Sequence, residues 1–366
     1  MNTRRWIFAA AILIPLLLLF PKSATAQWSS DPTVNTPVCT ESGDQWQPKT
    51  RSDDAGGVIV AWRDHSNGMA DIYVQRYDPN GNMQWASNGI VVCAAQGHQV
   101  RPAICPDGSG GAIIAWQDGR SSTTGDEIFA QKLNASGIAQ WTTDGIAISS
   151  ASYNQGYPNV ISDGSGGAFM TWSRTAGPGN YAQRINTAGV LQWGSGGISL
   201  GGGRGGQPMC PDGMGGFITL WTEGGNSYAQ RIAGDGTQQW TTGGIVLTSD
   251  IWVKMIMSDG NGGAYLGGLN GQPNQTARLQ RIDANGTCLW ATNGINLSSL
   301  STDAGGVSIT QDESGGVIAT WRDNRGGSDD NIYAQRVNSA GTIQWTAGGV
   351  PICTQSGNQN DPETIL

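Results

Sequence analysis

Residues 102–148 read PAICPDGSGGAIIAWQDGRSSTTGDEIFAQKLNASGIAQWTTDGIAI, and this stretch decides the fold of the chain. It holds four short apolar segments separated by glycine-rich or polar turns, and no segment has the spacing of a helix. The first segment ends before Asp107, the second ends at Trp116, the third covers residues 128–133, and the fourth begins at Trp141. Short strands joined by tight turns predict a four-stranded antiparallel sheet.

The same pattern recurs along the chain, with 47 to 57 residues between the tryptophans that open the fourth strand. Those tryptophans are Trp28, Trp85, Trp141, Trp193, Trp240, Trp290 and Trp345. An aspartate before the glycine turn and a Gln-Arg or Gln-Lys pair in the third strand recur with the same period. The second strand is apolar on both faces, as in residues 58–62, which indicates a sheet covered on both sides. We therefore predict an all-β protein, a β-propeller of four-stranded blades with six complete repeats plus a partial seventh.

The two ends of the chain carry the partial repeat. Residues 27–39 have the pattern of a fourth strand, and residues 361–366 have that of a first strand. We expect both to belong to one incomplete blade, in which the N-terminal strand is able to close the ring. The abrupt C-terminus leaves open a second interpretation, in which the chain is a structural fragment of a larger surface protein.

The N-terminus is typical of an export signal. A basic start precedes the apolar run 6–20, and Ala24-Thr25-Ala26 supplies small residues for cleavage. The run has 15 residues and contains Pro15, whereas a membrane-spanning helix needs roughly 20. We expect residues 1–26 to be a signal peptide and residues 27–366 to be the propeller domain. The mature protein would be secreted, periplasmic or on the cell surface, without membrane insertion after cleavage.

The charge of the chain limits its partners. The formal net charge is −8, and removing residues 1–26, which hold three basic residues and no acid, takes it to −11. Nucleic acids and anionic membranes require a basic face, so we do not expect them as partners. We expect a protein or glycan ligand at the cell surface instead.

Six cysteines in an exported chain raise the question of disulfides. Cys39, Cys93 and Cys353 occupy one column of the repeat, and Cys105 and Cys210 occupy another. Equivalent positions of different blades lie beyond the roughly 7 Å that can separate the Cα atoms of a bridge. We interpret most of these cysteines as small buried apolar side chains.

The sequence contains no motif for catalysis or metal binding. The glycine turns lack the alternating oxygen ligands of a calcium loop, and His65 and His98 form no zinc motif. No Gly-x-Ser-x-Gly element is present. We predict no catalytic residue, no metal site and no cofactor.

The loops between second and third strands vary in length and share one face of the predicted ring, where binding residues usually lie. Four repeats carry an acid on this face, two residues after the second-strand tryptophan: Asp64, Asp118, Glu223 and Asp323. We predict a ligand-binding surface there. The alternative is that these acids cap their strands and pair with nearby arginines such as Arg120 and Arg325, because repeated residues lack the asymmetry that catalysis needs.

Several elements of the repeat resemble the TolB-type propeller repeats of bacterial envelope proteins. They are Pro102-x-Ile104, Pro106-Asp107-Gly108, Asp118-x-Arg120 and residues 126–129. The added Gly-Gly pair and the Gln-Trp start of the fourth strand are more similar to poorly characterised repeat proteins exported by bacteria. The resemblance implies binding or assembly in the cell envelope, with no inherited active site.

We therefore expect a non-catalytic, exported propeller that acts as a protein- or glycan-binding module at the cell surface. The alternative is a carbohydrate-active enzyme, a polysaccharide lyase or hydrolase on a propeller scaffold. Glu223, His65 and His98 are the irregular residues that such an enzyme would draw on.

Overall fold

The computed structural model describes residues 28, 31, 33–121, 125–149, 153–174, 179–203, 208–248, 251–270, 275–298, 303–312 and 314–364. The predicted signal peptide, residues 1–26, lies outside them. The described chain forms 24 β-strands, arranged in six four-stranded antiparallel sheets. Six sheets with this topology confirm the predicted β-propeller and its four-stranded blades.

The blades follow one another along the chain, and all have the same strand order. Blade 1 contains β1 (Gln45–Ser52), β2 (Val58–Asp64), β3 (Asp71–Tyr77) and β4 (Ile90–Cys93), and blade 2 contains β5 (Gln99–Pro106), β6 (Ala112–Asp118), β7 (Glu127–Leu133) and β8 (Ile146–Ala147). Blade 3 contains β9 (Gln155–Ser162), β10 (Ala168–Arg174), β11 (Asn180–Ile185) and β12 (Ile198–Gly201), and blade 4 contains β13 (Met209–Pro211), β14 (Phe217–Glu223), β15 (Asn226–Ile232) and β16 (Ile245–Thr248). Blade 5 contains β17 (Ile251–Ser258), β18 (Ala264–Asn270), β19 (Ala277–Ile282) and β20 (Ile295–Asn296), and blade 6 contains β21 (Gly305–Gln311), β22 (Val317–Asp323), β23 (Asn331–Val337) and β24 (Val350–Cys353).

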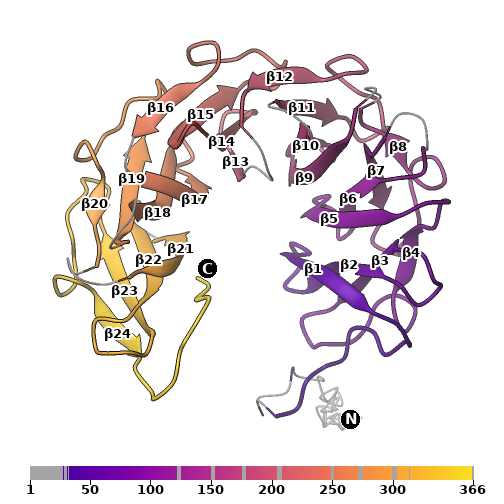
Figure 1. The fold of residues 1–366 in the computed structure, drawn as a ribbon. Helices are drawn as coiled ribbons and strands as arrows, with labels where there is room; N and C mark the ends of the chain where they lie inside the picture. The colour runs from indigo at the N-terminus through magenta and orange to yellow at the C-terminus, as the bar shows by residue number, and fades with distance from the viewer. Residues whose placement is uncertain are drawn as a thin grey trace, which may run out of the picture.

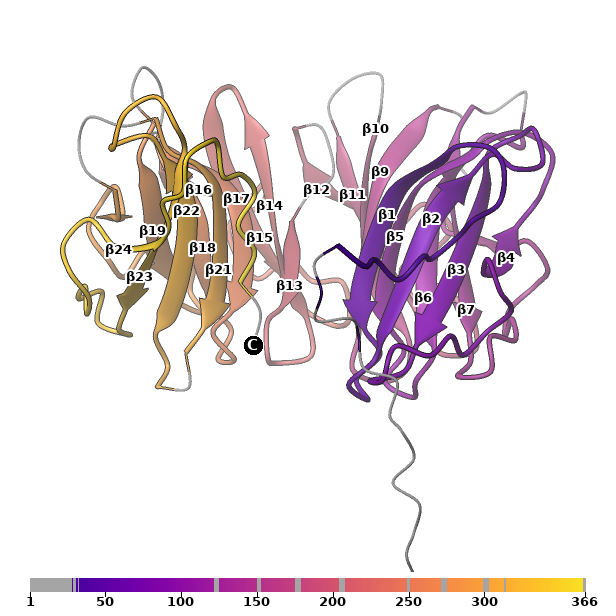
Figure 2. The same ribbon diagram turned by 90° about the horizontal axis from the view of Figure 1, so that it is seen from below.

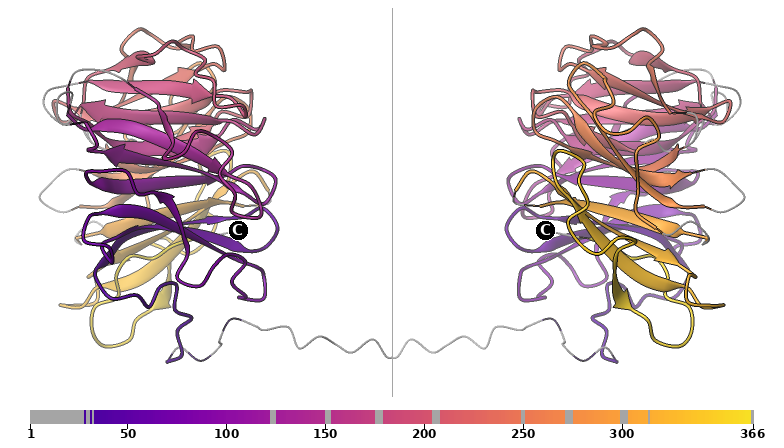
Figure 3. Two further views of the ribbon diagram at one scale, coloured as in Figure 1. Left: turned by 90° about the vertical axis from the view of Figure 1, so that its right-hand side faces the viewer. Right: turned by 90° about the vertical axis from the view of Figure 1, so that its left-hand side faces the viewer.

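The blades stand around a central axis, with the first strand of each innermost and the fourth outermost (Figure 1). Their strands run between the two faces of the ring (Figure 2), and the sheets stack face to face when the ring is seen from its side (Figure 3). Successive first strands pack against each other from β1 to β21, but β21 and β1 do not. The ring is therefore open between blade 6 and blade 1, an arc that we call the open sector (Figure 1).

The hydrophobic core lies between the blades. Between blades 1 and 2 it joins Ile59 and Ile72 to Ile114 and Trp116, all fully buried. The tryptophan near the end of the second strand is at most 3% exposed in all five blades that have one: Trp62, Trp116, Trp172, Trp221 and Trp321. Because a single sheet cannot cover both of its faces, each blade depends on its neighbours for stability.

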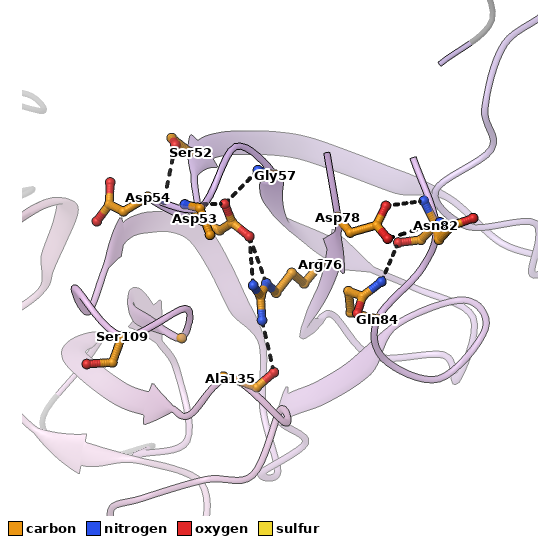
Figure 4. Close-up of polar contacts among 12 residues, drawn as sticks. Ser52, Asp53, Asp54, Gly57, Arg76, Asp78, Asn82, Gln84, Ser109 and Ala135 are labelled. Atoms are coloured by element: carbon orange, nitrogen blue, oxygen red, sulfur yellow. Dashed lines mark hydrogen bonds and ion pairs between the residues drawn. The ribbon is translucent and has the colours of Figure 1, made fainter. Parts of the chain in front are cut away.

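A polar cluster explains why the Asp-Gly turn and the Gln-Arg pair recur together (Figure 4). In blade 1, Asp53 Oδ1 accepts hydrogen bonds from the amides of Ala55 and Gly57, at 2.9 and 2.7 Å. Its Oδ2 accepts one from Arg76 Nε at 2.9 Å, and Arg76 Nη1 donates to the Ala135 carbonyl of blade 2 at 3.3 Å. The aspartate thus closes the turn, and the arginine joins that turn to the next blade.

Every blade repeats the ion pair: Arg76–Asp53, Lys132–Asp107, Arg184–Asp163, Arg231–Asp212, Arg281–Asp259 and Arg336–Asp312. Burial raises the pKa of Asp53, but hydrogen bonds from Ala55 and Arg76 outweigh this effect and leave the pKa below its usual value. The second residue of the Gly-Gly turn must be glycine, because a Cβ at Gly57 would overlap the Tyr77 carbonyl oxygen. The motif is therefore a structural turn, as its composition indicated.

The cysteines and the chain ends also bear on the sequence predictions. All six cysteines are free, and burial raises the pKa of the Cys93 thiol to about 12. The described residues among 28–44 form no strand, and neither do residues 354–364, although both segments pack against the ring. The N-terminal segment does not close the ring in this structure.

Candidate functional site

Three of the four acids predicted to form a binding surface are buried. Asp118, at the end of β6, is fully buried, and its Oδ2 accepts hydrogen bonds from Trp116 Nε1 at 2.7 Å and from Arg120 Nη2 at 2.6 Å. Asp64 and Asp323 are 2% and 0% exposed. Each accepts a hydrogen bond from the indole of its own strand.

These contacts are the capping and pairing that the alternative interpretation describes. Arg120 pairs with Asp118 and Arg325 pairs with Asp323, and each guanidinium also lies over an aromatic ring at 3.8 Å. In this conformation the three carboxylates have a structural partner and little contact with solvent. Their role in ligand binding remains a prediction.

Glu223 departs from this pattern. It ends β14 with an exposed side chain, and Trp221 Nε1 is buried without a hydrogen-bond partner among the described residues. The glutamate side chain is one methylene longer than that of aspartate. Its carboxylate lies away from the Trp221 indole and does not accept the hydrogen bond that Asp118 accepts from Trp116. Of the four predicted acids, Glu223 is the one that a ligand can reach.

The two histidines, His65 and His98, lie in neighbouring blades and have different surroundings. The His65 ring lies beside Trp46, with 6.1 Å between the ring centroids. His98 Nε2 lies 3.2 Å from Asp126 Oδ1, and the His98 side chain is 53% exposed. The histidines therefore belong to two separate local clusters.

The structure also contains a groove, which lies away from the variable loops where the sequence predicted a binding surface. It has a volume of about 430 Å³ and lies on the channel side of blades 1 to 3. Its walls come from three neighbouring first strands, β1, β5 and β9, which line the centre of the ring (Figure 1). The lining residues are Gln47, Lys49, Arg51, residues 101–104 and residues 157–159.

Three equivalent residues in this groove have an unusual backbone. Gln47, Arg101 and Tyr157 have φ angles of 56°, 55° and 57°, in the left-handed region. Each lies at a β-bulge, where the register with the second strand shifts, and each precedes a proline. A residue before proline prefers an extended backbone, and left-handed non-glycine residues cost about 1–3 kcal/mol each. Such strain, repeated on three adjacent strands, is typical of a functional site.

Arg101 is held rigidly within the groove. Its guanidinium carbon lies 4.1 Å from the centroid of the Tyr157 ring, and Nη2 donates to Tyr157 Oη at 3.3 Å. Its Nη1 donates to Gln117 Oε1 at 2.7 Å, and Gln117 is buried. Gln117 Nε2 in turn donates to Asp126 Oδ2 at 2.6 Å. The Arg101 guanidinium is therefore positioned in advance and still partly exposed.

The first strands carry positive charge only. Their charged residues are Lys49, Arg51, Arg101 and Lys254, and none of the six first strands contains Asp or Glu. Three of these four cations line the groove. In a chain with a formal net charge of −8, this local reversal favours an acidic ligand in the groove.

Comparisons with known proteins support the fold. No protein-family model matches the chain. No curated protein matches it either. Among solved structures, it is similar to a polysaccharide lyase PL25, an ulvan lyase bound to -[GlcA(1-4)Rha3S]-, with 10% identity, coverage of 84% of this chain and 86% of that chain, and a TM-score of 0.54.

Two further structures are similar at lower scores. The β-propeller domain of the Trilobed protease from Pyrococcus furiosus is 13% identical, with coverage of 86% of each chain and a TM-score of 0.47. TolB from Acinetobacter baumannii is 13% identical, with coverage of 87% of this chain and 81% of that chain, and a TM-score of 0.37. The six four-stranded sheets themselves define the chain as a β-propeller.

No helix in the described ranges is long and apolar enough to cross a membrane. Within the same ranges, no group of three or more His, Cys, Asp or Glu side chains could hold a metal ion.

Proposed function

We propose that this chain is an exported, non-catalytic propeller that binds an acidic glycan in the groove between β1, β5 and β9. The observation that carries the proposal is the fixed guanidinium of Arg101 in a cationic groove of an acidic protein. Export rests on the signal-like residues 1–26, and a location at the cell surface would give access to polysaccharides.

The chemistry of the groove fits a saccharide that bears carboxylate or sulfate groups. A guanidinium forms paired hydrogen bonds with such groups, and Lys49 and Arg51 add charge beside it. The Tyr157 side chain, 40% exposed, offers aromatic and hydroxyl contacts. At about 430 Å³ the groove lies in the size range of small-ligand sites. A protein partner would need a far larger surface, about 800 Å² on each side.

One structural neighbour offers a parallel. The ulvan lyase was solved with a saccharide of glucuronate and sulfated rhamnose. At 10% identity the likeness concerns the fold alone. It supports the choice of acidic polysaccharides for the first binding experiments.

Calorimetry on purified residues 27–366 tests the proposal. The ligands are an acidic oligosaccharide and its carboxyl-reduced, desulfated form. We expect the acidic form to bind and the neutral form to bind at least tenfold more weakly. Arg101→Ala should weaken binding of the acidic form at least tenfold, and Arg101→Lys should restore little, because lysine lacks the planar fork.

Lys254→Ala is the matched control, because Lys254 lies on the first strand β17 of blade 5, outside the groove. This variant should bind the acidic ligand as the parent does. Equal binding of the acidic and neutral forms, or unchanged binding by Arg101→Ala, would contradict the proposal.

A second candidate is a polysaccharide lyase or hydrolase acting in the same groove. The observation in its favour is that the His98–Asp126 pair is linked through Gln117 to Arg101, which contacts the Tyr157 hydroxyl. In such an enzyme Arg101 would neutralise a carboxylate of the substrate, and His98 would supply the acid–base group that transfers a proton. Incubation with acidic polysaccharides, followed for new chain ends, separates the candidates. Turnover that Tyr157→Phe or His98→Ala abolishes would replace binding alone with catalysis.

A further inference from the structure

Three of the closed junctions between blades share one set of contacts. At the junction of blades 1 and 2, Arg76 Nη1 and Trp85 Nε1 both donate to the Ala135 carbonyl, at 3.3 and 3.1 Å. At the junction of blades 5 and 6, Arg281 Nη1 and Trp290 Nε1 donate to the Ser339 carbonyl, both at 3.3 Å. The junction of blades 4 and 5 repeats this arrangement, with Arg231 Nη1 and Trp240 Nε1 donating to the Ala284 carbonyl at 3.3 and 2.9 Å. In these three junctions, one blade presents an arginine and an indole to a turn carbonyl of the blade that follows.

Blade 6 presents the same side chains to the open sector. Trp345 is 37% exposed, whereas Trp85 and Trp290 are each 8% exposed. Ile318 is half-buried, whereas its equivalent Ile59 is fully buried. Among the described residues, neither Arg336 nor Trp345 Nε1 donates a hydrogen bond to a following blade. This face of blade 6 has the residues of a junction without the blade that completes it.

On the other side of the open sector, the N-terminal segment takes the place of a fourth strand. Cys39 Sγ lies 3.8 Å from Asp64 Oδ2, the same contact that Cys93 of blade 1 makes with Asp118 of blade 2. The Thr40 amide donates to Asn88 Oδ1 at 3.0 Å. The equivalent contact at the next junction, from the Ala94 amide to Asp144 Oδ1, measures 3.2 Å. Residues 39 and 40 therefore cover blade 1 as the fourth strand of a preceding blade would.

The C-terminal segment takes the place of a first strand. The Gln359 amide donates to the Asp330 carbonyl at 2.9 Å, as the Gln155 amide donates to the Asp126 carbonyl at 2.8 Å. Asp361 has a φ of 48° and precedes Pro362, which repeats the left-handed residue before proline found at Gln47, Arg101 and Tyr157. The Thr364 amide donates to Ser308 Oγ of β21 at 3.0 Å. Residues 359–364 therefore lie beside blade 6 as the first strand of a following blade.

We propose that the open sector binds a two-stranded β-hairpin, which supplies the second and third strands of a seventh blade. The described chain places a first-strand segment on one side of the sector and a fourth-strand segment on the other. The order of strands in every blade leaves two positions between them. Pairing of an added strand with an unpaired backbone edge is an established mode of peptide recognition.

The contacts of the other junctions define the chemistry of the occupant. It is a hairpin of the repeat's own type, carried by a partner segment outside residues 28–364. Its second strand is apolar on both faces, to cover Ile318. It ends in Trp-x-Asp, because Cys353 of blade 6 is the equivalent of Cys93, which lies beside such an aspartate of the following blade. The turn after its third strand supplies the carbonyl that Arg336 and Trp345 lack.

A synthetic peptide of residues 53–82 is the test ligand, since it contains β2, β3 and the turn that follows β3, with Trp62-x-Asp64 and Gln75-Arg76. It is added to purified residues 27–366, and binding is measured by calorimetry and amide hydrogen exchange. We expect one peptide to bind per chain and to slow exchange at residues 361–364 and 33–40 at least tenfold. The same peptide with Val60→Pro and Val74→Pro should not bind, because proline removes ladder hydrogen bonds.

Two variants of the protein make the test specific. Ile318→Asp puts a charge on the half-buried face of blade 6 and should weaken peptide binding at least tenfold. Ile138→Asp changes a side chain that is 62% exposed in a turn of blade 2, and it should leave binding unchanged. Failure of the peptide to protect residues 361–364 would overturn the proposal, and so would equal binding by the Ile318→Asp variant. A dimer or a closed ring that excludes the peptide, seen by sedimentation and small-angle scattering, would also overturn it.

Discussion

The junction between blades 1 and 2 and the outward face of blade 6 are built from the same residue types, yet they differ in burial. Ile59 is fully buried at the junction, whereas Ile318, its equivalent, is half-buried at the open sector. Trp85 donates to a carbonyl of the next blade, whereas Trp345 has no such acceptor among the described residues. The stability of a blade therefore depends on its neighbour, as expected for stacked repeats. Equivalent substitutions at the two places should have unequal costs.

The largest effect is expected from Asp118→Ala at the closed junction. The change leaves Arg120 and the Trp116 indole without their buried acceptor, and breaking a buried pair costs about 3–5 kcal/mol. Chemical unfolding followed by tryptophan fluorescence measures the loss. Glu223→Ala removes the exposed acid of the same column and should change stability by less than about 0.5 kcal/mol. Equal costs would show that the burial of Asp118 is unimportant.

Ile59→Ala and Ile318→Ala compare the same apolar position at the two places. Ile59→Ala should cost about 2–5 kcal/mol, because it opens a cavity in a packed core. Ile318→Ala should cost about 1 kcal/mol, since a half-buried side chain removes less apolar area from water. Unfolding midpoints in urea give the difference. If Ile318→Ala were as costly as Ile59→Ala, the outward face of blade 6 would be covered in solution.

A smaller contrast concerns one hydrogen bond. Trp85→Phe retains an aromatic ring but loses the bond to Ala135, and this should cost about 0.5–1.5 kcal/mol. Trp345→Phe lacks a bond to lose and should have nearly the parent melting temperature. If the hairpin peptide supplies the missing carbonyl, the melting temperature of Trp345→Phe should fall below that of the parent when the peptide is present. Thermal melts with and without peptide provide the comparison.

The ion pairs of the turns predict a loss of stability in acid. The pKa values of Asp53 and Asp312 are both lowered in the folded chain, since hydrogen bonds and arginine contacts outweigh the effect of burial. A carboxyl with a lowered folded pKa contributes stability above its unfolded pKa of about 3.9 and loses it as pH falls through the folded value. The melting temperature should therefore drop below about pH 4. Asp53→Asn should be less stable at neutral pH and show a shallower drop, and an unchanged pH profile would contradict the assignment.

Much of the fold could be predicted from the sequence, because its signals are local. The repeat period, the four short strands and the Asp-Gly turn depend on residues close together in the chain. The Asp53 carboxylate, for example, bonds amides two and four residues away. The doubly apolar second strand also predicted that blades must stack, and the structure confirms this in the cores between them.

The candidate site was less predictable. The pairing of Asp118 and Asp323 with Arg120 and Arg325 was expected from the sequence as one alternative. The hydrogen bonds from the indoles to Asp64, Asp118 and Asp323 were not. The groove escaped notice because its three walls come from separate repeats. A signal did exist: Gln45, Gln99 and Gln155 each stand three residues before a proline, and the residue before each proline has the left-handed backbone.

The sequence by itself determined the blades, since strand, turn and ion pair arise within one repeat. Only the tertiary structure decided which equivalent residues are covered and which remain exposed. Cys93 and Cys353 occupy the same column, yet one is 1% exposed and the other half-exposed. The physical reason is that burial between blades requires a neighbour, and a repeat unit does not record whether a neighbour follows it.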